Sequence, residues 1–507
     1  MKKILNFAIV CAFFICCSVL FYGCFSKQYS ITISSTENGE VYTQQAKANA
    51  GEKIKVFVYA SDGYVLKQDT LKANDTLIEN FEFEMPECDV VISAQFVPAQ
   101  HSINYNTDEW TTHSNPLTFD LTTEIVLTDA TKPGYHFDGW YTTSDFSSKI
   151  TKINTDNNNF NIYPKFKQIF VYSIYNNKAQ IKDLTDYGDT LADLYIPSKI
   201  DGYDVSVVSV QRACQNIKTL TIEDGVEDIN PYLSFWGSEK LTTVNLPKSI
   251  GIWGYPSSPL FKNCTSLTTI NLDPQNPNIY QKDGVIYKFT SGTHYEVGYY
   301  EYVYMCCYPN GKTDSSFVIP DEVTHLLDFG KAKFSSVTLS KNLISCISEN
   351  PFAECENLTQ ISVNSSNTAY VANQNNLYKI TDTISTIRRC TLIFSASKSK
   401  ILDLSQTFAV NGQQYRVTDV FETALNQASI EKFIVDFDVI DVDIFKNCPN
   451  IKMLSTKQKP NPTTWSEQDR YADVLACNNI YWYSETKPST SGNYWYYNSN
   501  NNIVLWN

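Results

Sequence analysis

The sequence predicts a mainly β fold, made of two small β-rich modules, a repetitive solenoid and a small C-terminal cap. Before residue 170, short segments of alternating apolar and polar residues are separated by Asn-Gly and Asp-Gly turns, as in hairpins. In the middle of the chain a nine-residue phrase recurs at intervals of 24 and 26 residues. The 507 residues include 33 Tyr, 28 Phe and 8 Trp but only 19 Gly and 19 Pro, so the composition is that of a folded chain.

The first 24 residues predict an export signal. Lys2 and Lys3 precede an apolar run over residues 4–22, and Gly23-Cys24 ends it. This ending resembles the bacterial lipoprotein signal, which implies a signal peptide over residues 1–23, a lipid on Cys24 and a short linker over 24–30. An uncleaved anchor helix is the alternative, since ~20 apolar residues span a bilayer. With either anchor the body lies outside the cytoplasm.

Residues 31–98 predict the first β module. An alternating run at 53–58 and a closing run at 90–94 indicate short strands, and no helical period is present. The phrases at 50–53, 62–64 and 83–96 resemble the divergent internalin B-type repeat of bacterial surface proteins.

Residues 101–168 predict the second module. Its phrases GYHFDGWY at 134–141 and IYPKF at 162–166 resemble the Listeria–Bacteroides repeat, which implies a small β-grasp-like spacer. A module of this size has little room for a core, so we expect large rings such as Trp140 to fill it. A carbohydrate-stacking surface made by Trp140 and Tyr141 is the alternative.

Residues 171–455 predict a solenoid. The phrase Cys-x-x-Leu-x-x-Leu-x-Leu begins at residues 214, 264, 355 and 448, with a Ser-initiated copy at 238. This period and leucine spacing indicate leucine-rich repeats, whose Leu, Ile and Val face a continuous core while Thr, Asn and Lys face outward. Interruptions at 285–308 and 376–394 predict inserted hairpins, the first with its tip at 294–300.

A second phrase refines this interpretation. Ile319-Pro320-Asp321-Glu322-Val323 and the repeated Phe-Lys-Asn-Cys at 261–264 and 445–448 resemble the BspA-like, treponemal-type leucine-rich repeat. That family is found largely in surface proteins, some of them adhesins, and is not known for a shared catalytic site. The resemblance therefore implies a binding role.

The cysteines predict core packing rather than a disulfide framework. Four belong to the signal, and Cys214, Cys264, Cys355 and Cys448 recur once per coil, as small core residues would; disulfides are the alternative. The vicinal pair at 306–307 is expected on opposite faces of a strand rather than as a redox pair. Cys477, outside the repeats, is the candidate for a reactive thiol.

No motif predicts a catalytic residue, a metal site or a cofactor. Five histidines are dispersed, and a nucleophile elbow, a phosphate-binding loop and a His-Glu-x-x-His helix are absent. The aspartates at 436, 438, 441 and 443 could suggest calcium, but the loop glycine is missing and a solvent-facing turn is favoured. A carboxylate pair for glycoside hydrolysis stays open, because its spacing exists only in the fold.

Residues 456–507 predict a cap for the last coil. A linker at 457–462 leads to a short helix at 464–475 and then to aromatic strands at 480–484 and 493–497, expected as a hairpin. The alternative is an aromatic glycan platform, built from Trp482, Trp495, Tyr496 and Trp506.

The net charge of −14 argues against nucleic acid as a partner. We therefore expect a lipid-anchored, non-catalytic protein of the bacterial cell surface that binds a host or neighbouring-cell protein or glycan, as an adhesin does. Candidate ligand-facing residues are Tyr295, Tyr299, Tyr300, Trp482 and Trp495. An envelope protein with a partner in the same cell is the alternative, followed by a glycan-active enzyme.

Overall fold

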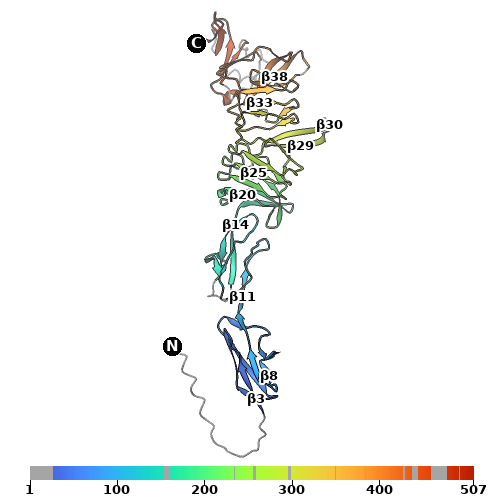
Figure 1. Cartoon of the computed structure of the whole chain (residues 1–507). Helices are drawn as coiled ribbons and strands as arrows, with labels where there is room; N and C mark the ends of the chain where they lie inside the picture. The colour runs from blue at the N-terminus through green and yellow to red at the C-terminus, as the bar shows by residue number, and fades with distance from the viewer. Residues whose placement is uncertain are drawn as a thin grey trace, which may run out of the picture. The chain divides into compact units, whose positions relative to one another are not determined.

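The computed structural model consists almost entirely of strands; its described helical elements are the 3-10 turn η1 (Gly188–Thr190) and the helix α1 (Ile444–Asn447) (Figure 1). It describes residues 27–506 except 121, 154–159, 233, 255–257, 295–297, 349, 383, 426–428, 437–442, 458–476 and 490–491, so the predicted signal and Cys24 lie outside it. Within the described part, no helix is long and apolar enough to cross a membrane. Among the described residues, one compact unit holds those up to Thr107 together with His113–Ala130 and Gly139–Lys165; the other holds Asp108–Thr112, Thr131–Asp138 and those from Phe166 onward.

The first module is organised by a sheet in the order β3-β1-β9-β6-β7. β1 lies between β3 and β9, antiparallel to β3 and parallel to β9. Alternation along β4 buries Ile54 and Val56 and exposes Lys53 and Lys55, as the sequence predicts. The strands are β1 (Gln28–Ile33), β2 (Gly39–Thr43), β3 (Lys47–Asn49), β4 (Lys53–Ala60), β5 (Tyr64–Leu66), β6 (Lys72–Ala73), β7 (Thr76–Leu77), β8 (Glu82–Glu84), β9 (Val90–Ser93) and β10 (Phe96–Pro98).

The second module repeats this plan, since β11 is antiparallel to β12 and parallel to β17. Trp140 and Tyr141 are 2% and 7% exposed, and the Trp140 Nε1 donates a hydrogen bond to the Thr128 carbonyl at 2.7 Å. The prediction that these rings fill the core is confirmed, and the stacking-surface alternative is wrong. The strands are β11 (Gln100–Tyr105), β12 (Thr118–Asp120), β13 (Ile125–Val126), β14 (Tyr135–Tyr141), β15 (Lys149–Ile150), β16 (Lys152–Ile153) and β17 (Phe160–Gln168).

The solenoid begins with two ladders, β20-β23-β25-β27 and β18-β19-β22-β24-β26, whose strands in successive coils run parallel. Leu220, Val244 and Ile270 lie opposite one another in successive coils and are buried, which confirms the predicted repeat. The strands are β18 (Phe170–Tyr175), β19 (Lys178–Leu184), β20 (Asp193–Ile196), β21 (Lys199–Ile200), β22 (Tyr203–Val208), β23 (Thr219–Ile222), β24 (Asp228–Ile229), β25 (Thr243–Leu246), β26 (Gly251–Ile252) and β27 (Thr269–Leu272).

The first predicted insertion is an antiparallel hairpin of β29 and β30, with residues 294 and 298 opposite each other at its tip. The second strand of the hairpin also pairs in parallel with β32 and so takes a place in the ladder. The ladders then resume as β30-β32-β34 and β31-β33-β35. The strands are β28 (Tyr280–Lys282), β29 (Val285–His294), β30 (Gly298–Cys307), β31 (Ser316–Val318), β32 (His325–Leu326), β33 (Ser336–Leu339), β34 (Ser345–Cys346) and β35 (Gln360–Val363).

The second predicted insertion is also confirmed, since β37 and β38 pair antiparallel in the sheet β36-β37-β38-β41-β40. The final ladder has the order β39-β42-β43-β44-β45-β46. The strands are β36 (Tyr370–Asn373), β37 (Asn376–Ile380), β38 (Ile387–Ser395), β39 (Ile401–Asp403), β40 (Phe408–Val410), β41 (Gln413–Val420), β42 (Lys432–Val435), β43 (Lys452–Ser455), β44 (Ile480–Tyr483), β45 (Tyr494–Tyr497) and β46 (Ile503–Leu505).

The C-terminal strands differ from the predicted hairpin. β44 and β45 pair in parallel, with Trp482 opposite Tyr494, and only β46 turns back antiparallel. The parallel arrangement lets Trp482 and Tyr494 join the same core cluster as Met453, so each strand continues the ladder instead of folding over its end. The predicted helix at 464–475 lies outside the described residues.

Candidate functional site

The outward side of the first ladder carries rows of short polar side chains. Thr221, Asn245 and Asn271 occupy matching positions on β23, β25 and β27. The Asn245 Nδ2 donates to Thr221 Oγ1 at 2.9 Å, and the Asn271 Nδ2 donates to Asn245 Oδ1 at 2.8 Å. These bonds hold the side chains in one orientation, so the row is a preorganised surface of amide and hydroxyl groups that can bind a polar partner.

The hairpin of β29 and β30 adds an aromatic surface beside the coils, from which it extends to one side in Figure 1. Phe289 and Tyr299 are 48% and 67% exposed. Tyr300 is half-buried and stacks on Tyr302 with ring centroids 4.8 Å apart. The Lys288 Nζ donates to two carbonyl groups of the preceding coil, each at 2.8 Å, and thereby ties the hairpin to the solenoid.

The two tryptophans expected to face a ligand lie in the core. Trp482 and Trp495 are 5% and 0% exposed, and the Trp495 Nε1 donates to the Ser455 carbonyl at 2.7 Å. The expectation is wrong for both, because each face of the ladder packs against its own apolar cluster: Trp482 lies in the cluster of Met453, and Trp495 in that of Leu454. Their burial supports the cap over the glycan platform. Tyr295, another of the candidates, lies outside the described residues.

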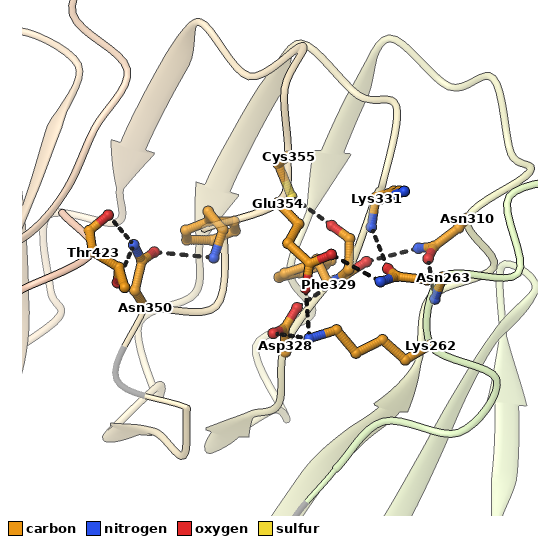
Figure 2. A network of polar contacts seen from close by, with 12 residues as sticks. Lys262, Asn263, Asn310, Asp328, Phe329, Lys331, Asn350, Glu354, Cys355 and Thr423 are labelled. Atoms are coloured by element: carbon orange, nitrogen blue, oxygen red, sulfur yellow. Dashed lines mark hydrogen bonds and ion pairs between the residues drawn. The ribbon is translucent and has the colours of Figure 1, made fainter. Parts of the chain in front are cut away.

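A buried network of charged groups joins the coils on either side of the hairpin (Figure 2). The Lys262 Nζ lies 2.6 Å from Asp328 Oδ2 and 2.7 Å from Glu354 Oε1. The side chains of Lys262 and Asp328 are only 13% and 14% exposed. The Asn263 Nδ2 donates to Glu354 Oε2 at 2.8 Å, and the backbone N–H of Lys331 donates to Asn263 Oδ1 at 3.1 Å. Each of these polar groups has a partner, so we interpret the network as a structural clamp.

The protonation of this clamp follows from burial and from its own hydrogen bonds. Burial raises the pKa of Asp328 above its ordinary value, although the hydrogen bond from Lys262 acts against the shift. Burial acts to lower the pKa of Lys262, but the hydrogen bonds and charges of Asp328 and Glu354 outweigh it, so this pKa is raised. Burial likewise opposes the shift at Glu354, whose pKa is lowered by the hydrogen bonds from Lys262 and Asn263. The ammonium group is therefore held charged.

A recurring asparagine, which the sequence analysis did not single out, connects neighbouring coils. The Asn367 Nδ2 donates to the carbonyls of Ser340 and Leu343 at 2.7 and 3.0 Å. Asn276 makes the same two bonds to its own preceding coil, each at 2.9 Å. Both residues stand four positions after the end of a ladder strand, at Leu272 and Val363, and this shared offset was a signal available in the sequence.

None of the cysteines that the structure describes forms a disulfide. The prediction of core placement is confirmed for Cys214, Cys264 and Cys355, which are at most 1% exposed, whereas Cys448 is half-buried. Burial raises the pKa of Cys264 to about 12, far from the range of a reactive thiolate. The exposed thiol is Cys88, which the sequence analysis passed over. Both thiols of the vicinal pair at 306–307 are buried as well. The thiol of Cys477, the predicted reactive thiol, is half-buried.

The acidic cluster forms no described metal site. No three His, Cys, Asp or Glu side chains in the described part of the chain lie close enough together to hold a metal ion. Asp436 accepts a hydrogen bond from the Arg416 guanidinium, and Asp443 immediately precedes α1. The aspartates at 438 and 441 lie outside the described residues.

Parallel ladders with one strand per coil and inward Leu, Ile and Val define a leucine-rich-repeat protein. The family model for the BspA type leucine rich repeat region matches residues 209–288, 303–393 and 328–452, in 6 copies. The model for the divergent InlB B-repeat domain matches residues 29–100. The chain therefore contains a BspA-type leucine-rich-repeat region and an N-terminal divergent InlB B-repeat domain.

Solved structures with similarity to the chain are leucine-rich-repeat proteins and a vaccine antigen. A leucine rich cell surface protein from Faecalibacterium prausnitzii is 16% identical with a TM-score of 0.27, over 57% of this chain and 93% of that one. A leucine-rich repeat protein from Bacteroides ovatus is 14% identical with a TM-score of 0.29, over 57% and 70%. The pneumococcal vaccine antigen PcpA is 14% identical with a TM-score of 0.26, over 65% and 97%. No curated protein sequence matches the chain.

Proposed function

We propose that this chain is a non-catalytic binding protein of the bacterial cell surface, held at the membrane by a lipid on Cys24, and that its repeats bind a protein or glycan of a host or neighbouring cell. The family, the predicted export signal and the rigid outward rows of the ladder support this function. The observation that carries it is the hairpin of β29 and β30, an insertion into the regular repeat that exposes both Phe289 and Tyr299.

An exposed aromatic pair on a tethered hairpin suits recognition. Aromatic rings supply much contact area with few rotatable bonds, and Tyr and Trp are common among the residues that dominate binding energies. The neighbouring Tyr300 and Tyr302 already stack on each other, and the Tyr299 hydroxyl donates to Glu301 Oε1 at 2.9 Å, so little ordering is needed on binding. The polar row on β23, β25 and β27 supplies further hydrogen-bonding groups in the same repeats.

The proposal is tested by screening the chain without its signal against glycans and extracellular-matrix proteins. We expect a ligand to be retained, and the double variant F289S/Y299S to lose about tenfold or more in affinity. The matched control is Y175S/Y232S, which removes two tyrosines that are 63% and 57% exposed elsewhere in the same unit. Absence of any ligand, or equal loss in both variants, would reject the hairpin as a binding surface.

The anchor is tested separately with the variant C24A. Lipid attachment predicts that the wild-type chain partitions with membranes and takes up a labelled fatty acid, and that the variant does neither. Membrane partitioning without label would favour the uncleaved anchor helix. Protease treatment of intact cells addresses the alternative of a partner in the same cell, because a surface adhesin is cut whereas an enclosed envelope protein is protected.

A further inference from the structure

A pocket of about 220 Å³ lies between the loop that follows β35 and the turn joining β40 to β41. Tyr370 and Tyr415, which are 2% and 6% exposed, contribute to its wall. Most of the remaining lining is short and polar. These side chains belong to Asn364, Ser365, Ser366, Asn367, Thr368, Asn411 and Gln413.

Arg388 of β38 also lines this pocket, directly opposite Tyr415 in the sheet register. Its Nε is buried and has no hydrogen-bond acceptor. Among the described residues, no ion pair joins its guanidinium to a carboxylate, whereas Arg416 on the adjacent strand is paired with Asp436. A guanidinium carries five N–H donors and is always charged, so leaving it half-buried and unpartnered is costly without a compensating anion.

The other side chains of the pocket also leave the charge of Arg388 without a counter-charge. The chain has 54 Asp and Glu against 40 Lys and Arg, yet none of the described residues that line the pocket is acidic. The positive charge of Arg388 is therefore not neutralised at the pocket wall. A planar guanidinium matches a carboxylate in shape and can bind it through two parallel hydrogen bonds.

The size of the pocket and its other side chains indicate which kind of molecule bears the carboxylate. The volume is below the ~300–1,000 Å³ of sites for drug-sized ligands, so it suits a single ring rather than an extended chain. Serine, threonine and amide side chains both donate and accept hydrogen bonds, which is what a ring bearing several hydroxyl groups requires. We propose that this pocket binds a carboxylate-bearing sugar, with the acid group on Arg388 and the ring hydroxyls on Ser365, Ser366, Thr368 and Asn411. The amide of Asn367 takes no part, because it is already bonded to the preceding coil.

This site is separate from the aromatic hairpin, and the two can fail independently. The pocket is tested with the chain lacking its signal, using glucuronate as the probe and glucose as its neutral counterpart, with binding followed by ligand-observed NMR and calorimetry. We expect glucuronate to bind and glucose to bind about tenfold or more weakly, because the charged hydrogen bonds are lost. The variant R388Q should lose the preference, and R388K should keep only part of it.

The matched control is R389Q, which removes the same charge from the exposed neighbouring residue and should bind as the wild type does. A second variant, S366F, fills the pocket from its exposed rim without touching the charge and should also abolish binding. Equal binding of glucuronate and glucose, or unchanged binding by R388Q, would overturn the proposal. If N-acetylaspartate competes as well as glucuronate does, the pocket recognises a carboxylate without a sugar ring, and the sugar assignment is wrong.

Discussion

Replacing Lys262 by methionine should destabilise the solenoid strongly at neutral pH. The variant keeps most of the apolar stem but leaves the carboxylates of Asp328 and Glu354 without their ammonium partner. Removing one member of a buried ion pair typically costs ~3–5 kcal/mol. The side chain of Asp328 is 14% exposed, so its pair with Lys262 counts as buried. Glu354 is 34% exposed, so its unpaired carboxylate should contribute less to the loss of stability.

The stability that K262M loses relative to wild type should also depend on pH. Burial already raises the pKa of Asp328, and loss of the Lys262 hydrogen bond and charge removes the two strongest opposing influences. A carboxyl whose pKa is higher in the folded state stabilises that state at low pH, and this stability is lost as the pH rises through the folded value. The gap between K262M and wild type should therefore be smaller near pH ~4.5 than near pH ~7.5.

Urea denaturation followed by circular dichroism measures both effects. The control K341M removes an ion pair to Asp321 in which the side chains are 47% and 54% exposed, and it should cost only ~0–1 kcal/mol. The double variant K262M/D328N should recover much of the lost stability, because the buried charge is gone. The interpretation as a buried clamp would be refuted if K262M lowered the free energy of unfolding no more than K341M does. It would also be refuted if the difference between K262M and wild type did not change with pH.

Three further outcomes follow from buried groups. Burial lowers the pKa of His325 from 6.5 to about 4, so its stabilisation, about 3 kcal/mol, is present above pH 6.5 and is lost as the pH falls through the folded value; H325F should flatten this acid limb in denaturation titrations. Iodoacetamide at pH ~8 should label exposed Cys88 and spare Cys264, since burial raises the pKa of Cys264 to about 12, and mass spectrometry showing fast labelling of Cys264 would contradict its packing. Phe352 is 0% exposed, so F352A should cost ~3–5 kcal/mol in urea denaturation, and a loss below ~1 kcal/mol would be inconsistent with a packed core.

The ladder strands were predictable because a local pattern and a period both point to them. Leu220, Val244 and Ile270 alternate with polar residues, and their spacing in the sequence is also the spacing of the coils in space. The inserted hairpins were predictable for a related reason, since aromatic strand segments interrupt an otherwise regular repeat. The C-terminal strands were not, because an aromatic pair joined by a polar turn is typical of a hairpin, and only the continuing ladder makes Trp482 and Tyr494 parallel neighbours.

The candidate sites were less predictable than the fold. Tyr299 could be named from the sequence because the tip of an inserted hairpin is solvent-facing. Trp482 and Trp495 could not be assigned correctly, because the face of a strand that is buried depends on which strand lies next to it. Nothing in the sequence around Arg388 indicates a site. Its role in the pocket depends on the absence of a carboxylate partner among the described residues, which only the surrounding sheet determines.

The sequence by itself determined the repeat, the mainly β class and the inserted hairpins, because periodicity and turn chemistry are local. The export signal in the first 24 residues stays a prediction. Only the tertiary structure decided which side chains meet across coils. Lys262 reaches Asp328, 66 residues away, and the unpartnered Arg388 shares a pocket with Asn364 and Asn411. The physical reason is that burial and pairing depend on groups far apart in the chain, and the stacking of coils brings these groups together.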